Sequence, residues 1–179
     1  NTSVAAYGII ANLALIVVSI FTGIAQGIQP IISKSYGEGK SKDIKSIFKY
    51  GLITAIVLGI GCYLIGLSFS EEIVNLFNSE GDKLLLVMAV EGINIYFTGF
   101  IIMGVNIVIT SFFASINKPK ESFVISMMRG LVIVIPLILV LPNIFHMTGV
   151  WLTIPLAEAI TILIIIKLYG IKWVKDIII

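Results

Sequence analysis

Apolar residues in this chain gather in five long runs and do not alternate with polar ones. The runs cover residues 7–32, 51–69, 92–114, 123–141 and 150–168. A helix of about 20 residues, rising 1.5 Å per residue, crosses about 30 Å of bilayer hydrocarbon. Because lipid offers no partner to backbone N–H and C=O groups, and barrel strands would alternate, we expect an all-α bundle with about five transmembrane helices.

The composition supports a lipid-embedded chain. Of the 179 residues, 58% are hydrophobic and 12% charged, where soluble domains carry about 25% charged residues. A net charge of +2, without a basic face studded with aromatics, gives no support to nucleic-acid binding. Cys62 is the only cysteine, which excludes an intrachain disulfide and a cysteine-based zinc site. We expect no metal site.

The lysines predict how the bundle is oriented. Eleven of the twelve basic residues lie in or beside the loops on one side of the predicted membrane, and only Lys83 lies on the other. The eleven are Lys34, Lys40, Lys42, Lys45, Lys49, Lys118, Lys120, Arg129, Lys167, Lys172 and Lys175. Since cytoplasmic loops carry an excess of Lys and Arg, this side is predicted to be cytoplasmic, with the N-terminal end of the chain outside and the C-terminus inside.

Two local patterns add detail. The external loop SEEIVNLFNSEGDK has apolar residues at helical spacing, which predicts a short helix at the membrane interface. Small residues recur in the runs, among them the pair Gly23 and Gly27, and are interpreted as helix-packing positions. The chain begins Asn1-Thr2-Ser3, without an initiator methionine or a signal-peptide pattern, and is interpreted as a fragment.

Two stretches resemble a known transporter family. TGIAQGIQPIISKSYGEGK, residues 22–40, is similar to the end of the eighth helix of MATE (multidrug and toxic compound extrusion) transporters, with its Gln-Gly-x-Gln-Pro step and Tyr-Gly-x-Gly turn. RGLVIVIPLILVLPNIFHMTGVWLTIPLAE, residues 129–158, resembles the last two helices of that family. Between them, LFNSEGDKLL resembles the external loop before the tenth helix.

The resemblance implies that residues 1–179 form the C-terminal lobe, helices eight to twelve, of a twelve-helix, two-lobe transporter. Helix seven and the N-terminal lobe would be missing, and the latter would be a partner within the same polypeptide. The implied function is a secondary antiporter in a bacterial plasma membrane that exports cationic or amphipathic drugs in exchange for H⁺ or Na⁺. It would need no cofactor besides that coupling ion and would not be an enzyme.

Glu158 is the leading candidate for ion chemistry. It lies about nine residues from the external end of its run, which is about 13 Å deep at 1.5 Å per residue. A charge there costs several kcal/mol unless it is neutralised, paired or hydrated. Glu158 is therefore either a cation or proton site, or half of a structural pair with Arg129, and the sequence favours neither reading.

Other polar residues and prolines in the runs are secondary candidates. Gln26, Gln29, Asn94 and Asn106 are candidates for a cavity or a polar network, with hydrogen bonding between helices as the simpler reading. Pro30, Pro136 and Pro155 are candidate hinges, since a proline inside a helix removes a hydrogen bond and favours a kink; a static bend is the simpler reading.

Three other functions compete with drug antiport. A lipid-linked oligosaccharide flippase of the same superfamily would usually line its cavity with more basic residues than the single Arg129. A structural membrane module needs no chemistry. An intramembrane enzyme would need a nucleophile or metal constellation, whereas the single histidine, His146, is in a short external loop and no P-loop is present.

Overall fold

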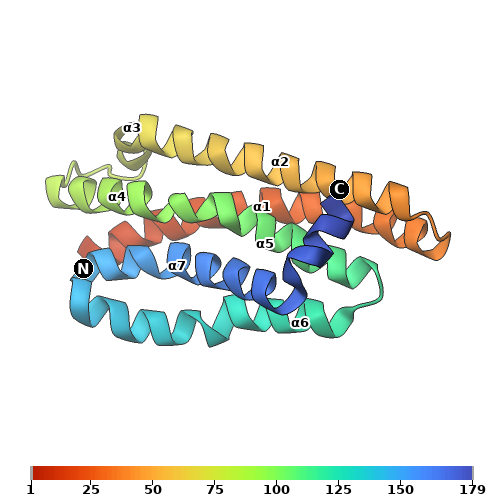
Figure 1. Cartoon of the computed structure of the whole chain (residues 1–179). Coiled ribbons are helices and arrows are strands. Elements are labelled where there is room, and N and C mark those ends of the chain that lie inside the picture. The colour runs from red at the N-terminus through yellow and green to blue at the C-terminus, as the bar shows by residue number, and fades with distance from the viewer. Residues whose placement is uncertain (1, 179) are drawn as a thin grey trace.

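The regular elements of the described part of the chain are all helices. The computed structural model describes the backbone of residues 2–178 and the side chains of residues 2–169. Its elements are α1 (Thr2–Gly37), α2 (Ser41–Ser68), α3 (Ser70–Asn75), α4 (Lys83–Tyr96), α5 (Thr98–Ser115), α6 (Pro119–Met127), the π-helical turn η1 (Met128–Val132) and α7 (Val134–Ile178). The expected all-α bundle is confirmed (Figure 1).

The long helices make five passes along the bundle. Four helical stretches of the described residues are long and apolar enough to cross a membrane, and the last of them, Pro119–Tyr169, doubles back on itself (Figure 1). At the reversal Gly149 lies against the backbone of Leu141, and His146 has a φ of 52°. In a straight helix Arg129 and Glu158 would be about 43 Å apart, whereas they are in contact across the two arms.

Two predicted spans are interrupted. The run 92–114 begins earlier, in α4, and is broken at Phe97 before α5 starts. The run 123–141 is divided by η1, where the N–H of Ile133 donates to the carbonyl of Met128, five residues back, at 2.9 Å. Pro136 has no N–H to offer the carbonyl of Val132, which explains why regular α-helix does not continue through this point.

One of the three candidate hinge prolines, Pro136, is not placed as expected. Pro136 lies in the first turn of α7, just after the interruption, and not inside a continuous helix. Pro30 and Pro155 do lie inside α1 and α7. Whether any of the three acts as a hinge stays a prediction.

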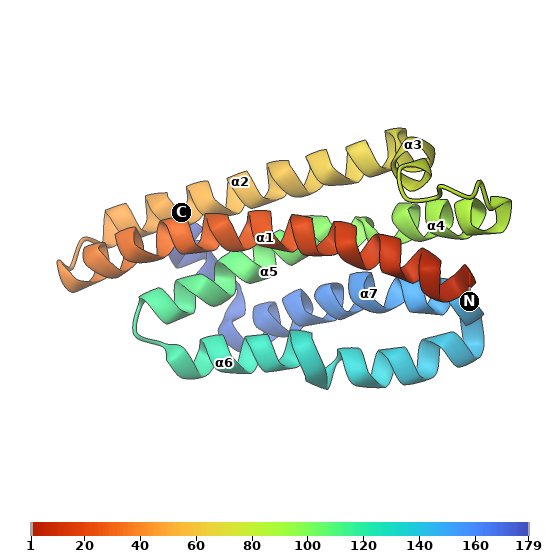
Figure 2. The ribbon, with the colours of Figure 1, turned by 180° about the vertical axis from the view of Figure 1, so that it is seen from behind.

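The core is built around α5, which contacts α1, α2, α6 and α7 (Figure 2). Glycines bring backbones together here: Gly59 of α2 lies against the backbone of Ile101, and Gly104 of α5 faces the ring of Phe21. This agrees with the use of small residues at helix interfaces in membranes. A Cβ added at Gly23 or Gly27, by contrast, would meet no atom within 4 Å among the described residues, so their packing role stays a prediction.

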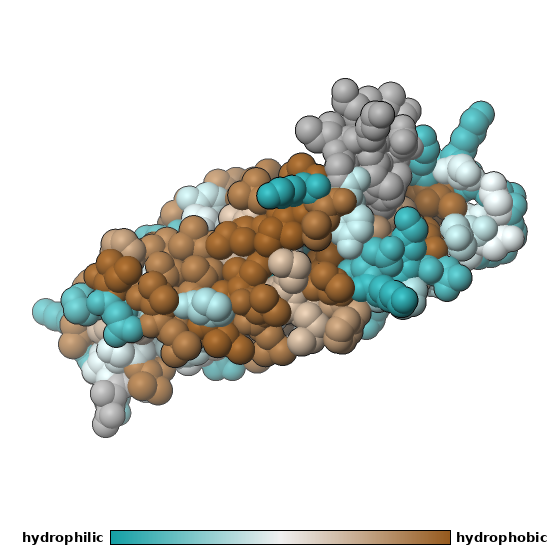
Figure 3. Space-filling model, turned by 60° about the horizontal axis from the view of Figure 1, so that its bottom comes forward, coloured by the Kyte–Doolittle hydropathy of each residue, from teal (hydrophilic) through white to brown (hydrophobic). Residues whose placement is uncertain are grey.

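The outside of the bundle is apolar. Large hydrophobic side chains are exposed along α2 and along residues 131–145, and brown surface covers most of the face in Figure 3. Examples are Ile53, Val57, Leu64, Leu131, Ile135, Leu139 and Ile144. Exposed apolar area on this scale fits lipid and not water.

The segments that connect the long helices have the conformations that their residues favour. The predicted short helix of the external loop is present as α3. The turn after α1 contains Gly39 with a φ of 70°, a left-handed conformation that glycine adopts without steric cost. The end of the bundle that holds this turn and the α5–α6 turn carries most of the lysines and is called the lysine-rich end below; the side chains of Lys172 and Lys175 lie outside the described residues.

The contact at Gly59 leads to a stability prediction. A Cβ added there would lie 2.8 Å from Cα of Ile101 and 3.0 Å from the carbonyl oxygen of Phe100. Both are backbone atoms, so α2 and α5 must separate. Gly59→Ala is expected to lower stability by about 1–3 kcal/mol, the usual cost of overpacking, measured as thermal unfolding in detergent.

Gly61→Ala is the matched control, because a Cβ at Gly61 meets no atom within 4 Å. It is two residues away on the same helix and should leave the unfolding temperature unchanged or slightly raised. Equal effects of the two substitutions would contradict the packing described here.

Candidate functional site

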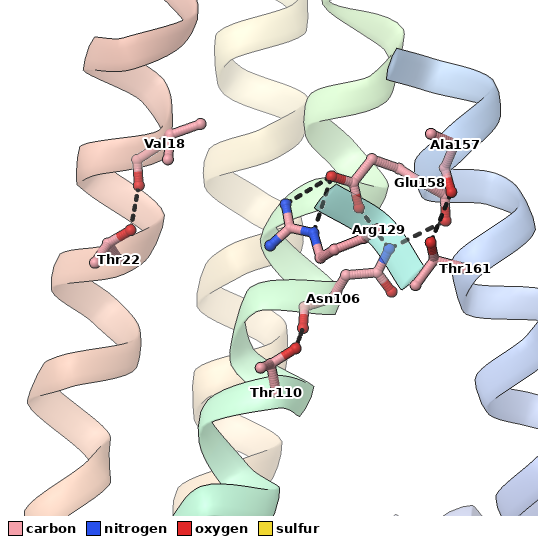
Figure 4. Close-up of polar contacts among 8 residues, drawn as sticks. All are labelled: Val18, Thr22, Asn106, Thr110, Arg129, Ala157, Glu158 and Thr161. Carbon is pink, nitrogen blue, oxygen red and sulfur yellow. Dashed lines mark hydrogen bonds and ion pairs between the residues drawn. The ribbon is translucent and has the colours of Figure 1, made fainter. Parts of the chain in front are cut away.

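The centre of the site is the carboxylate of Glu158, on the returning arm of α7. Glu158 is 4% exposed, and its Oε1 accepts hydrogen bonds from Nη2 of Arg129 at 2.6 Å and from Nε at 3.2 Å. Figure 4 shows the guanidinium and the carboxylate meeting between two arms of the chain. An ion pair held by two N–H donors is of the strong, geometrically defined kind.

Arg129 reaches this position from the π-helical turn η1. The turn carries one extra residue relative to an α-helix, and such insertions are frequent at functional sites. The side chain of Arg129 is 20% exposed, against 5% for that of Glu158. The arginine is therefore the more accessible half of the pair.

Asn106 of α5 completes the contacts of the carboxylate. It is fully buried, and its Nδ2 donates to Oε2 of Glu158 at 2.7 Å and to the carbonyl oxygen of Glu158 at 3.0 Å. Its own Oδ1 is buried and has no hydrogen-bond partner among the described residues. Asn106 thus links α5 to α7. Its Oδ1 is an unpaired acceptor beside the ion pair, and a buried polar atom without a hydrogen bond lowers stability.

An open pocket of about 320 Å³ exposes one side of the pair. It is lined by Met103, Ser126, Arg129, Gly130, Val134, Ile154 and Glu158. Most of this lining is apolar, which makes the carboxylate and the guanidinium the strongest electrostatic features of the pocket.

Arg129 also borders a second pocket of about 230 Å³. Its lining is Thr22, Ala25, Gln26, Gln29, Ile107, Thr110, Ser111, Ala114 and Arg129. Pro30 lies four residues after Gln26 and has no N–H, so the carbonyl of Gln26 lacks its helical donor. Ser111 ties α1 to α5 here by donating to the carbonyl of Ala25 at 3.1 Å.

The structure brings some of the predicted site residues together and places others inside or outside the pockets. It brings Glu158, Arg129 and Asn106 together, and it places Gln26 and Gln29 in the second pocket. Asn94 lines neither pocket, and its buried Oδ1 has no partner among the described residues.

The prolines lie near the site without lining it. Pro155 is three residues before Glu158 and faces Gly99, whose added Cβ would lie 3.1 Å from Cα of the proline. Pro30 directly follows Gln29 of the second pocket, and Pro136 follows η1 along the chain. Neither proline lines a pocket described above.

Sequence reasoning missed several lining residues. Ser126 precedes Arg129 by three positions and Thr110 follows Asn106 by four, so helical spacing could have placed each on the same face as its partner. Met103 precedes Asn106 by three positions, so the same spacing applied to it. Among the described residues no three His, Cys, Asp or Glu side chains lie together as metal ligands would.

An apolar exterior, five helical passes and a buried ion pair beside open pockets define a polytopic helical membrane protein with a polar interior site. A family model described as MatE matches residues 1–140, and the chain belongs to the MATE family of multidrug efflux transporters. The resemblance drawn from the motifs is confirmed.

Individual relatives agree with the family. The multidrug export protein MepA of Staphylococcus saprophyticus is 23% identical over 160 residues, which are 89% of this chain and 35% of that protein. The solved structure of the MATE multidrug transporter DinF-BH, determined as a complex, matches with a TM-score of 0.83 and 26% identity, over 96% of this chain and 38% of that one.

A second solved structure, of a MATE protein in complex with MaD3S, matches with a TM-score of 0.85 and 18% identity, over 96% of this chain and 38% of that one. At this identity the match concerns the fold alone. The chain spans little more than a third of the length of the proteins it matches.

The ion pair leads to a second stability prediction. Removing one partner of a buried pair leaves an uncompensated charge and costs about 3–5 kcal/mol. We expect this loss for Arg129→Leu, and a smaller loss for the double variant Arg129→Leu with Glu158→Gln, measured by unfolding in detergent. With Glu158→Gln alone measured as well, the loss in the double variant minus the sum of the two single losses gives the coupling between the two residues.

Glu91→Gln is the control. Glu91 is exposed and accepts one hydrogen bond from Thr148 at 2.7 Å, so its neutralisation should change stability by less than about 1 kcal/mol. If the losses from Arg129 and Glu158 simply add, the pair does not act as a unit.

Proposed function

We propose that this chain is part of a secondary antiporter that exports cationic or amphipathic organic compounds in exchange for H⁺ or Na⁺, and that Glu158 is its ion-coupling residue. The observation that carries the proposal is a buried carboxylate, ion-paired to Arg129, on the wall of an open pocket inside an apolar bundle. Ionisable groups within membrane-spanning segments mark ion and proton pathways.

The geometry offers a way for an ion to change the shape of the bundle. Glu158 holds η1 through Arg129 and α5 through Asn106, so three segments meet at one carboxylate. Neutralising that carboxylate weakens both links at once. A ligand that binds one arrangement better than the other shifts the population towards it, which is the basis of alternating access.

We propose further that the chain corresponds to the C-terminal lobe of its family. Both pockets are open, and the matched proteins are about two and a half times as long as this chain. The rest of such a protein would supply the facing wall. The lysine-rich end would be cytoplasmic, in a bacterial plasma membrane, by the positive-inside rule.

The substrate class is supported by relatives and not by geometry. MepA is named a multidrug export protein, and DinF-BH is named a MATE multidrug transporter. The exposed part of the first pocket combines an apolar lining with one carboxylate, a chemistry that suits a lipophilic cation once Arg129 is displaced.

Efflux of ethidium from cells expressing the whole natural protein tests the proposal. Glu158→Gln should reduce energised efflux by about 5- to 150-fold, the range that coupling free energies of 1–3 kcal/mol produce. Glu91→Gln, which neutralises a carboxylate outside both pockets, should retain efflux. Unchanged efflux by Glu158→Gln would remove this residue from the coupling mechanism.

A further inference from the structure

We infer that Arg129 makes the Glu158 site selective for a proton and excludes a sodium ion. The inference rests on the proposed function, since it names the ion that the antiporter would use. It follows from the polarity of the groups around the carboxylate, from an unused acceptor on Asn106, and from a second position open to the guanidinium.

Every hydrogen bond to the carboxylate within the described residues comes from an N–H group. Oε1 faces Nη2 and Nε of Arg129, and Oε2 faces Nδ2 of Asn106. A hard cation such as Na⁺ needs several oxygen ligands, and N–H groups present hydrogen atoms towards the position it would take. The guanidinium occupies that position with its own positive charge and repels a second cation.

A proton is repelled by the same charge, but it needs no shell of oxygen ligands and binds directly to one carboxylate oxygen. Binding of H⁺ from water to Oε2 forms an O–H bond, and the net charge of the Arg129–Glu158 pair rises from zero to +1. Oε2 then becomes a donor and needs an acceptor. Rotation of the Asn106 amide would turn Oδ1, which is buried and has no partner among the described residues, towards that O–H group.

Once released from Glu158, the guanidinium of Arg129 could move into the second pocket. Arg129 already lines the second pocket, which contains the side chains of Gln26 and Gln29 and lies beside the carbonyl that Pro30 leaves without a donor. These groups offer neutral oxygen acceptors and no competing acid. Protonation would therefore move Arg129 from Glu158 towards α1.

Few other charged or titratable groups surround Glu158. α5 carries none. On α4, the phenol of Tyr96 is close enough to Glu158 to interact electrostatically, Lys83 is at the other end of the helix, and Glu91 accepts a hydrogen bond from Thr148. The remaining groups on neighbouring elements are Tyr7, Lys34, Tyr36, Lys42, Asp43, Lys45, Lys49, Tyr50, Cys62, Tyr63, Lys120, Glu121, His146, Lys167 and Tyr169. Tyr169 lies against the ring of Phe113. None of the others forms a hydrogen bond or ion pair with Glu158 or Arg129 in the described residues.

Sodium-specific stabilisation of the whole natural protein tests the inference. In NaCl and in KCl of equal concentration the unsubstituted protein should unfold at the same temperature. Arg129→Leu leaves the carboxylate without its cation and should gain stability in NaCl only, by mass action of the bound ion. Arg129→Leu with Glu158→Gln should lose that gain.

Two further variants keep the test decisive. Arg129→Lys retains the positive charge and should remain insensitive to sodium. If Arg129→Leu does not accumulate, Arg129→Gln removes the charge but keeps a hydrogen-bonding side chain. A sodium response in the unsubstituted protein, or its absence in both neutral variants, would overturn the inference.

Proton release on addition of ethidium, in weakly buffered detergent solution, separates the inference from the proposed function. The expected result is release by the unsubstituted protein and none by Glu158→Gln. Efflux of ethidium driven by a sodium gradient alone would overturn proton selectivity and leave the antiporter standing. No efflux of ethidium under either gradient would count against the proposed function itself.

Discussion

A carboxylate inside a lipid-embedded bundle must be compensated, and the arrangement of this chain around Glu158 depends on that requirement. Ionised and unpaired, it would cost several kcal/mol. The compensation comes from Arg129, which is 29 positions away in the sequence and reaches Glu158 only because the last helical stretch folds back on itself. The two arms that follow from the reversal, the π-helical turn and the contact with α5 meet at this pair.

The inner helices make close contacts, whereas the outer surface of the bundle is apolar. α5 lies at the centre, where glycines allow backbone contact with α2 and where Asn106 meets Glu158. The exposed sides of α2 and of residues 131–145 are apolar and need only to match lipid. The residues that line the two pockets come from α1, α5, α6, η1 and α7.

The sequence predicted the passes well and their interruptions poorly. Apolar runs locate helices because a helix in lipid satisfies its own backbone, but they do not show where hydrogen bonding changes register. The break at Phe97 and the π-helical turn at residues 128–132 were therefore missed. Pro136 indicated a disturbance, but it did not specify that an extra residue would be accommodated at residues 128–132.

The site was predicted in part for a similar reason. Glu158 and Arg129 stood out because charges in apolar runs are rare, and their pairing was one of two readings. The contact of Asn106 with Glu158 joins residues 52 positions apart and depends on helix rotation, which one sequence does not fix. Gly23 and Gly27 fit a packing motif, but they face open space in the described part of the chain.

The central claim is that Glu158 changes its protonation state while Arg129 excludes other cations. Infrared difference spectroscopy of the whole protein in lipid, recorded between alkaline and acidic pH, tests it most directly. The expected result is a protonated carboxyl band on acidification that disappears in Glu158→Gln and is unaffected by replacing K⁺ with Na⁺. The absence of any band that depends on Glu158, or carboxylate bands that respond to sodium, would contradict it.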